Sequence, residues 1–242
     1  MWAYIHLLPI LCRTGGAGGY WCIHRIRVAN LPARGYSVAR QLGRVEDRRV
    51  DIFLQTPRLV LRPFTDDDVD LLIELDSDPE VMRYLGNGRP TPPERIISTV
   101  HPHFVKHPDQ YFAAYETQSD TFIGWFELAY KPDVGPRDRE LGYRLRRAAW
   151  GKGYATEGSR ALIEKAFTEL GVDRVWAETM AVNTASRRVM EKAGLRYVRT
   201  YHTEWDEPIP GTEHGEVVYE LHRADWETAR HSGSDNAIGH GS

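Results

Sequence analysis

The sequence predicts a mixed α/β domain, in which helices flank a central sheet that is largely antiparallel. Two observations predict this class. Apolar segments at 111–116 and 122–129 are joined by a polar turn, as expected for an antiparallel hairpin. Farther along, a strand at 140–146, a helix at 153–170 and a strand at 174–180 follow one another, which predicts one strand-helix-strand crossover.

The elements can be justified in order along the chain. Leu59–Pro63 alternates like a strand, and Thr65 before the three acids at 66–68 marks a helix start, because acids are favoured at the positive end of the helix dipole. Further helices are expected at 79–85, 93–106, 153–170 and 184–193. Strands are expected at 59–63, 111–116, 122–129, 140–146, 174–180, 195–203 and 216–221.

The 242 residues, 41% of them hydrophobic, suffice for one sizeable core with terminal extensions. Residues 1–52 lack sustained periodicity and are expected to form a poorly ordered extension. The domain is expected at 53–228. Residues 229–242 are rich in Gly, Ser, His and Asn, which predicts a disordered C-terminal tail.

Composition argues against several classes of partner. The 31 basic residues against 34 acidic ones do not provide the basic excess of a nucleic-acid-binding surface. The apolar opening at 1–12 contains Pro9 and is too short to span a bilayer, so no membrane is expected. Only Cys12 and Cys22 are present, which favours a reducing, cytoplasmic setting. No metal site is expected, because Cys22 and His24 lack a second pair at ligand spacing.

One segment has the pattern of a phosphate-binding loop. Gly151 and Gly153 stand where a strand gives way to a helix, and their missing side chains leave the backbone open to a ligand. The unpaired amides of the first helical turn carry partial positive charge, which favours a bound pyrophosphate. Lys152 and Arg147 add charge of the right sign. The loop is not the dinucleotide fingerprint, because Thr156 stands at the third glycine position.

Several motifs together resemble one family. They are Thr56-Pro-Arg-Leu-Val-Leu-Arg-Pro-Phe64, Glu140-Leu-Gly-Tyr-Arg-Leu145, Arg147-Ala-Ala-Trp-Gly-Lys-Gly-Tyr-Ala-Thr156 and Asn183-Thr-Ala-Ser-Arg-Arg-Val-Met-Glu-Lys-Ala-Gly-Leu195. In this order they resemble the GNAT superfamily of acetyltransferases, and most closely its RimJ/RimL-like N-acetyltransferases of the acetyltransferase 3 type. The resemblance covers about 56–223, with Ala148 where the family pattern has Gln or Arg.

The resemblance implies that the sheet splays beside strand 140–146 and opens a slot for the pantetheine arm of acetyl-CoA. Leu145 and Arg147 are expected to supply backbone contacts to this arm. The pyrophosphate is expected on Gly151, Lys152, Gly153, Tyr154, Ala155 and Thr156. Asn183 either binds the pantetheine or only caps its helix, and Ser186 either protonates the departing thiolate or is an exposed helical serine.

A base must remove a proton from the amine before the amine attacks a thioester, and carboxylates are the usual candidates. Glu204 resembles the location of the proposed base in RimL-like enzymes, and Glu140 is the competing candidate. The acids near the expected acceptor side suit a cationic acceptor: Glu204, Asp206, Glu207, Glu213 and Glu216. Aromatic residues either line an acceptor pocket or belong to the core: Trp125, Phe126, Tyr143, Trp150 and Trp205.

The function expected is transfer of an acetyl group from acetyl-CoA to a primary amine, on a protein N-terminus or a small molecule. The competing hypothesis is a non-catalytic acyl-CoA sensor with the same fold. Ala148 is the feature that favours the sensor. The protein is expected to act as a monomer or homodimer.

Overall fold

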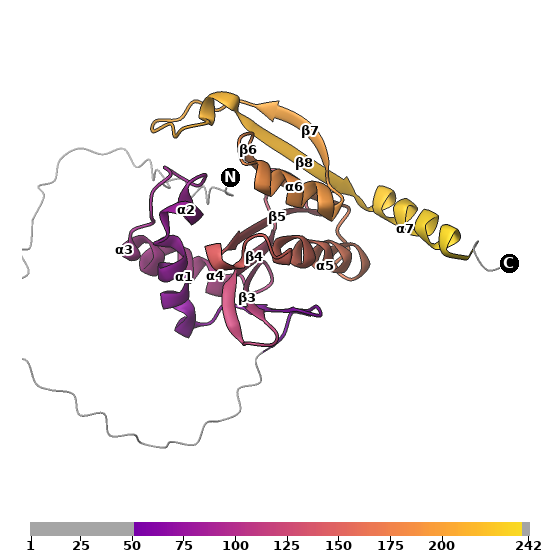
Figure 1. Ribbon diagram of the computed structural model, residues 1–242, viewed down its shortest axis with the longest axis horizontal. Helices are drawn as coiled ribbons and strands as arrows, with labels where there is room; N and C mark the ends of the chain where they lie inside the picture. The colour runs from indigo at the N-terminus through magenta and orange to yellow at the C-terminus, as the bar shows by residue number, and fades with distance from the viewer. Residues whose placement is uncertain (1–50, 239–242) are drawn as a thin grey trace, which may run out of the picture. The chain divides into compact units, whose positions relative to one another are not determined.

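The computed structural model describes residues 51–238, which form one sheet with helices on both of its faces (Figure 1). The strands are β1 (Leu54–Gln55), β2 (Leu59–Pro63), β3 (Tyr111–Glu116), β4 (Thr121–Ala129), β5 (Asp138–Leu145), β6 (Arg174–Met180), β7 (Arg196–Tyr201) and β8 (Glu216–His222). The helices are α1 (Val69–Asp76), α2 (Pro79–Met82), α3 (Pro93–Arg95), α4 (His101–Lys106), α5 (Tyr154–Thr168), α6 (Thr184–Ala193) and α7 (Arg223–Ile238). A π-helical stretch at Ile96–Val100 joins α3 to α4.

The sheet order is β1-β2-β3-β4-β5-β6-β8-β7, and every neighbouring pair is antiparallel except β5 and β6. That parallel pair is joined through α5, which is the predicted crossover. Its register extends only from Asp138 opposite Arg174 to Glu140 opposite Trp176. Beyond these residues the strands no longer pair with each other. The predicted mixed, largely antiparallel sheet and its splay are therefore confirmed.

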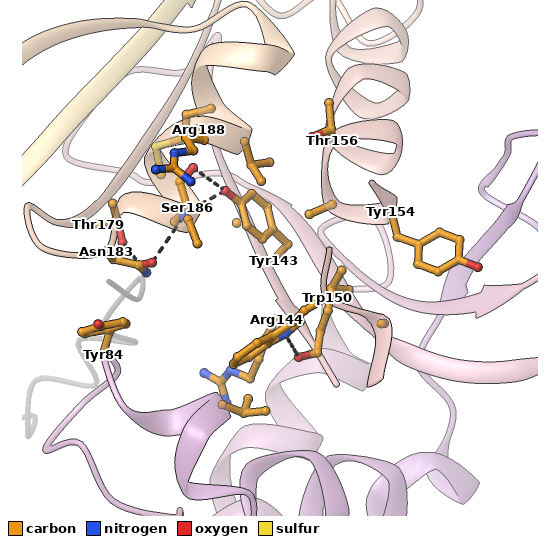
Figure 2. Close-up of a pocket in the computed structure, with 18 of the residues that line it drawn as sticks. Tyr84, Tyr143, Arg144, Trp150, Tyr154, Thr156, Thr179, Asn183, Ser186 and Arg188 are labelled. Carbon is orange, nitrogen blue, oxygen red and sulfur yellow. Dashed lines mark hydrogen bonds between the residues drawn. The ribbon is translucent and has the colours of Figure 1, made fainter. Parts of the chain in front are cut away.

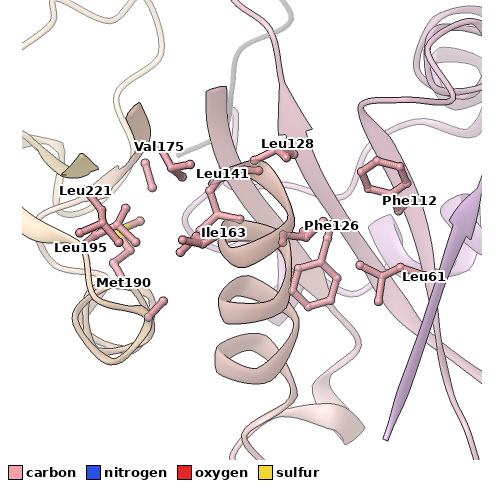
Figure 3. Close-up of a cluster of buried hydrophobic side chains, with 14 of the residues drawn as sticks. Leu61, Phe112, Phe126, Leu128, Leu141, Ile163, Val175, Met190, Leu195 and Leu221 are labelled. Carbon is pink, nitrogen blue, oxygen red and sulfur yellow. The ribbon is translucent and has the colours of Figure 1, made fainter. Parts of the chain in front are cut away.

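Alternation along β4 divides the core between the two faces of the sheet. Phe126 and Leu128 belong to the buried cluster that includes the inner side of α5 and of α6, as Figure 3 shows around Ile163. Trp125 and Ala129 belong to a second cluster, with side chains of α1 and α4. Each fully buried leucine or phenylalanine side chain in these clusters contributes roughly 1.5–3 kcal/mol.

Helix α5 lies unusually close to the sheet at one point. A Cβ added at Gly158 would come within 2.4 Å of Cζ of Phe126, which is itself fully buried. The absence of a side chain at Gly158 therefore sets how closely α5 approaches β4. This contact fixes the position of the helix whose first turn carries the expected pyrophosphate site.

The C-terminal segment differs from the expectation. Helix α7 continues through 229–238, within the range where a disordered tail was expected. Arg230 lies over the Trp226 ring and forms an ion pair with Glu164 of α5, with 2.6 Å between Nη1 and Oε1. These contacts support a helix whose sequence has little apolar periodicity. Strand β1 was not expected either, because a two-residue strand has no periodicity to detect.

The expected poorly ordered extension lies almost entirely outside the described residues. So do Cys12, Cys22, His24 and the apolar opening, and their predictions stay predictions. Within 51–238, no helix is both long enough and apolar enough to cross a bilayer.

We predict that Gly158→Ala lowers the free energy of unfolding, although alanine is normally the better helix former by about 1 kcal/mol. The added methyl group has no room against Phe126, and overpacking of this kind costs ~1–3 kcal/mol. Urea denaturation measures the effect, with Thr168→Ala at an exposed position of α5 as the control. An unchanged or higher stability of Gly158→Ala would contradict the packing described above.

Candidate active site

A cavity of about 480 Å³ opens where β5 and β6 part (Figure 2). Its walls include Leu141–Leu145 of β5 and the facing pair Glu178 and Thr179 of β6. Residues of α2, β4, α6 and the start of α5 complete it. The cavity therefore occupies the gap that the short β5–β6 register leaves in the sheet.

The loop before α5 presents open backbone to this cavity. Gly151 and Gly153 have φ of +72° and +84°, a left-handed conformation that glycine adopts without strain. Gly153 is the N-cap of α5 and offers no side chain to its first amides, and a Cβ at Gly151 would meet nothing within 4 Å. Unpaired amides at the positive end of a fifteen-residue helix fit the pyrophosphate of coenzyme A.

Arg58 supports this loop from the segment before β2. Its Nη1 donates to the carbonyl oxygen of Lys152 over 3.0 Å, and its Nε donates to Oε2 of Glu157 over 2.6 Å. The hydroxyl of Thr56 also donates to the Glu157 carboxylate over 2.6 Å, and the Arg58 guanidinium lies over the Tyr154 ring. These contacts hold the pKa of Glu157 below its usual range, although its partial burial opposes this. Arg58 thus neutralises an acid in the first turn of α5.

Most of the residues expected to bind the cofactor meet at this cavity. They are Leu145, Gly151, Gly153, Tyr154, Ala155, Thr156 and Asn183. The ring of Tyr154 points away from the cavity in Figure 2, and its hydroxyl donates to Glu116. Arg147 and Lys152 are exposed and do not line the cavity, so their part in cofactor binding stays a prediction. Two cations that were not expected, Arg188 and Lys192 of α6, do line it.

Ser186 lies at the cavity in a network of hydrogen bonds (Figure 2). Its hydroxyl is 2.9 Å from the hydroxyl of Tyr143, which reaches across from β5. The backbone amide of Ser186 donates to Oδ1 of Asn183 over 3.2 Å, so Asn183 caps α6 and also lines the cavity. The amide group of Asn183 donates in turn to Thr179. This network fixes the Ser186 hydroxyl in the opening between the strands.

The two acids expected as candidates for the base lie elsewhere. Glu140 is buried and forms an ion pair with Lys131, with 2.9 Å between Oε2 and Nζ. Burial raises the pKa of Glu140, while Lys131 opposes that rise. Glu204 is exposed on the connection between β7 and β8. Neither residue lines the cavity, and their catalytic roles stay predictions.

Glu127 of β4, which the sequence analysis did not select, lines the cavity and is only 3% exposed. A Cβ at the neighbouring Gly142 of β5 would come within 2.2 Å of Glu127 Oε1, so glycine makes room for this carboxyl. Burial, reinforced by the nearby Glu140, raises the pKa of Glu127 to about 8. A single acid inside the otherwise apolar run 122–129 was the signal that could have identified it.

Acids gather on the face of the sheet opposite α5 and α6. Alternation along the strands places Glu127, Glu140, Glu178 and Glu216 on this face, one on each of β4, β5, β6 and β8. Glu127 and Glu178 line the cavity. Two cations, Arg83 and Arg144, also line the cavity, and Arg144 on this face is paired with Asp76. With Arg144 paired, the acid-rich end of the cavity at Glu127 and Glu178 suits a cationic ligand.

The five aromatic residues selected from the sequence lie in three different places. Trp125, Tyr143 and Trp150 line the cavity, whereas Phe126 lies in the core under α5. Trp205 lines a second, smaller cavity. Among the residues that the structure describes, no group of three or more His, Cys, Asp or Glu side chains is arranged to hold a metal ion.

Comparison with known proteins extends this picture. A family model described as "Acetyltransferase (GNAT) domain" matches residues 58–196. The FsC-acetyl coenzyme A-N(2)-transacetylase of Aspergillus fumigatus is 38% identical over 182 residues, which are 72% of this chain and 77% of that protein.

Two solved structures with bound coenzyme A share the fold. Spermidine N-acetyltransferase from Vibrio cholerae, in complex with CoA and spermine, has a TM-score of 0.60 at 16% identity and covers 71% of this chain and 99% of its own. RimL, a ribosomal L7/L12 alpha-N-protein acetyltransferase in complex with coenzyme A, has a TM-score of 0.60 at 17% identity. The match covers 71% of this chain and 98% of the RimL chain. These two structures share the fold, while the family match over residues 58–196 and the Aspergillus fumigatus relative show that the chain belongs to the GNAT family of acetyl-CoA-dependent N-acetyltransferases.

Proposed function

We propose that this protein transfers the acetyl group of acetyl-CoA to a primary amine of a small cationic molecule. The observation that carries the proposal is one continuous cavity that runs from the open amides before α5, through the gap between β5 and β6, to the face that carries Glu127 and Glu178. The Aspergillus fumigatus relative is named FsC-acetyl coenzyme A-N(2)-transacetylase, and the Vibrio cholerae neighbour was solved with spermine, a small cationic amine, which supports this class of acceptor. A RimJ/RimL-like subtype, a cytoplasmic site of action and a monomeric or homodimeric state belong to the same proposal.

Bound acetyl-CoA supplies a thioester, whose carbonyl carbon forms a bond to the amine nitrogen as its bond to sulfur breaks. The amides from Gly151 to Thr156 hold the pyrophosphate, and Arg188 adds positive charge from the opposite wall. The unpaired edge of β5 beyond Glu140 offers backbone groups to the pantetheine arm. These contacts orient the thioester toward the acid-rich end of the cavity.

Glu127 is the base in this proposal. An ammonium nitrogen loses two protons for each amide formed. One leaves through Glu127 to water. The departing thiolate takes the proton of the Ser186 hydroxyl, and the second proton of the nitrogen restores that hydroxyl. Tyr143 keeps that hydroxyl aimed into the gap between the strands. A buried carboxyl with a raised pKa suits a base that works near neutral pH.

A panel of acceptors tests the proposed function. Purified protein is incubated with acetyl-CoA and FsC, spermine, an aminoglycoside or a peptide with a free N-terminus, and released thiol and the mass of each acceptor are measured. We expect thiol release with the small cationic amines. Acetylation confined to the peptide would contradict the proposed acceptor class, and coenzyme A binding without thiol release with any amine would favour the sensor.

We predict that Glu127→Gln lowers kcat/KM for the amine about 10²–10⁴-fold, because it removes the proton acceptor. In the wild type kcat/KM should rise with pH through the raised pKa of Glu127, about 8, since only the carboxylate accepts a proton. Stopped-assay rates across a pH series measure both effects. In Glu127→Gln, kcat/KM should no longer rise with pH around this pKa.

Folding provides the control for this variant. A raised pKa means that the folded state binds the proton of Glu127 more tightly than the unfolded state, so its contribution to stability is lost as pH rises through the folded pKa. Glu127→Gln should therefore unfold no more easily than the wild type above that pH. If Glu204→Gln or Glu140→Gln loses the rate while Glu127→Gln keeps it, the base is assigned wrongly.

We predict that Arg58→Ala raises the KM for acetyl-CoA about tenfold with little change in kcat, because Glu157 would then repel the pyrophosphate. Glu157→Gln in the same protein should restore part of the loss, since it removes the repelling charge. Arg137→Ala, which breaks an exposed ion pair with Asp173, is the control. Equal KM values for Arg58→Ala and wild type would show that this support does not matter for binding.

A further inference from the structure

A second cavity, of about 10 Å³, lies under the connection between β7 and β8. Its walls are formed by Tyr84, Gly86, Met180, Trp205, Glu207, Ile209, Thr212 and Glu216. Tyr84 also lines the main cavity, so the two spaces share a wall. A volume of this size holds about one water molecule or one group of similar size.

Glu216 is the most deeply buried acid in this small cavity. It is only 1% exposed, and its Oε2 has no hydrogen-bond partner within the described part of the chain. Burial of a carboxylate without a partner is costly, and burial here raises the pKa of Glu216 to about 7, helped by Glu178. Glu140 on the same face differs, because Lys131 pairs with it. Within residues 51–238, Glu216 therefore has no ion pair like the one that Lys131 forms with Glu140.

The surroundings of Glu216 add negative charge and aromatic rings. Glu178 lies diagonally across from it on β6, because Met180 is opposite Glu216 and Val218 is opposite Glu178. The hydroxyl of Tyr201 donates to Oε2 of Glu178 over 2.8 Å. Glu207 lines the same small cavity, together with the rings of Tyr84 and Trp205.

This combination selects one chemistry. Carboxylates favour a cation, and aromatic rings stabilise a cation that lies against their faces. A primary ammonium group is close to a water molecule in size and carries three donors, one of which would satisfy the free oxygen of Glu216. A guanidinium group is larger than the space, and an anion would be repelled.

We propose that Glu216 and Glu207 form a subsite for a second ammonium group of the acceptor, so that the preferred substrates carry at least two amines. The inference rests on the proposed function. One amine reaches the thioester beside Glu127 in the main cavity, and the second enters the small cavity past Tyr84. The second amine is held and does not react.

Linear α,ω-diaminoalkanes of increasing length, each compared with the n-alkylamine of equal carbon number, test this subsite. The wild type should prefer one or more diamines over the matched monoamines by about tenfold or more in kcat/KM. Glu216→Gln should bring this preference close to one while leaving the monoamine rate and the calorimetric affinity for acetyl-CoA unchanged. Asp206→Asn, an exposed charge on the same connection that lines neither cavity, should keep the preference.

The possible results are distinguishable. If no amine releases thiol from the wild type, the proposed function fails. If the wild type acetylates amines without preferring diamines, only the subsite is overturned, and the small cavity holds water. The same conclusion follows if the wild type prefers diamines and Glu216→Gln prefers them equally. Equal losses on monoamines and diamines would assign Glu216 to the reaction and also contradict the subsite. If Glu216→Gln does not fold, Glu207→Gln tests the same preference from an exposed loop position.

Discussion

Strands β5 and β6 pair at three positions and then separate, and the rest of the site depends on this separation. A continuous sheet would satisfy the backbone groups of β5 beyond Glu140 with a neighbouring strand, and the cavity would not exist. Because β5 and β6 separate, the backbone groups of β5 beyond Glu140 lie at the wall of a cavity, which is lined by residues from both faces of the sheet. In the proposed function, this opening takes the cofactor from one side and the acceptor from the other.

The crossover helix determines where the cofactor end of this space lies. Helix α5 leads from β5 to β6, and its contact with Phe126 at Gly158 sets its distance from the sheet. Its first turn then meets the mouth of the opening, with two glycines in left-handed conformation before it. Arg58 pairs with Glu157 in that turn. The negative charge of Glu157 therefore does not cancel the partial positive charge at the start of the helix. One helix thus links the packing of the core to the proposed binding of the pyrophosphate.

Local patterns predicted most elements of the fold and the glycine loop before α5, because alternation, helix starts and paired glycines are readable over a few residues. Features that depend on contacts between distant segments were not predictable in this way. Arg58 meets Glu157 across 99 positions of sequence, and the position of Glu127 over Gly142 depends on strand register. Glu204 follows β7 on a connection without local periodicity, so its distance from the cavity was not readable either. Helix α7 was missed because its contacts to α5, and not an apolar stripe, support it.

In the proposed complex, the amides before α5 bind the pyrophosphate while the pantetheine arm lies in the gap between β5 and β6. A crystal structure of the protein with coenzyme A tests this claim most directly. We expect the pyrophosphate oxygens within hydrogen-bond distance of the amides from Gly151 to Thr156, and the thiol beside Ser186 in the gap. Coenzyme A bound at any other place, or a gap closed by pairing of β5 with β6, would contradict the account.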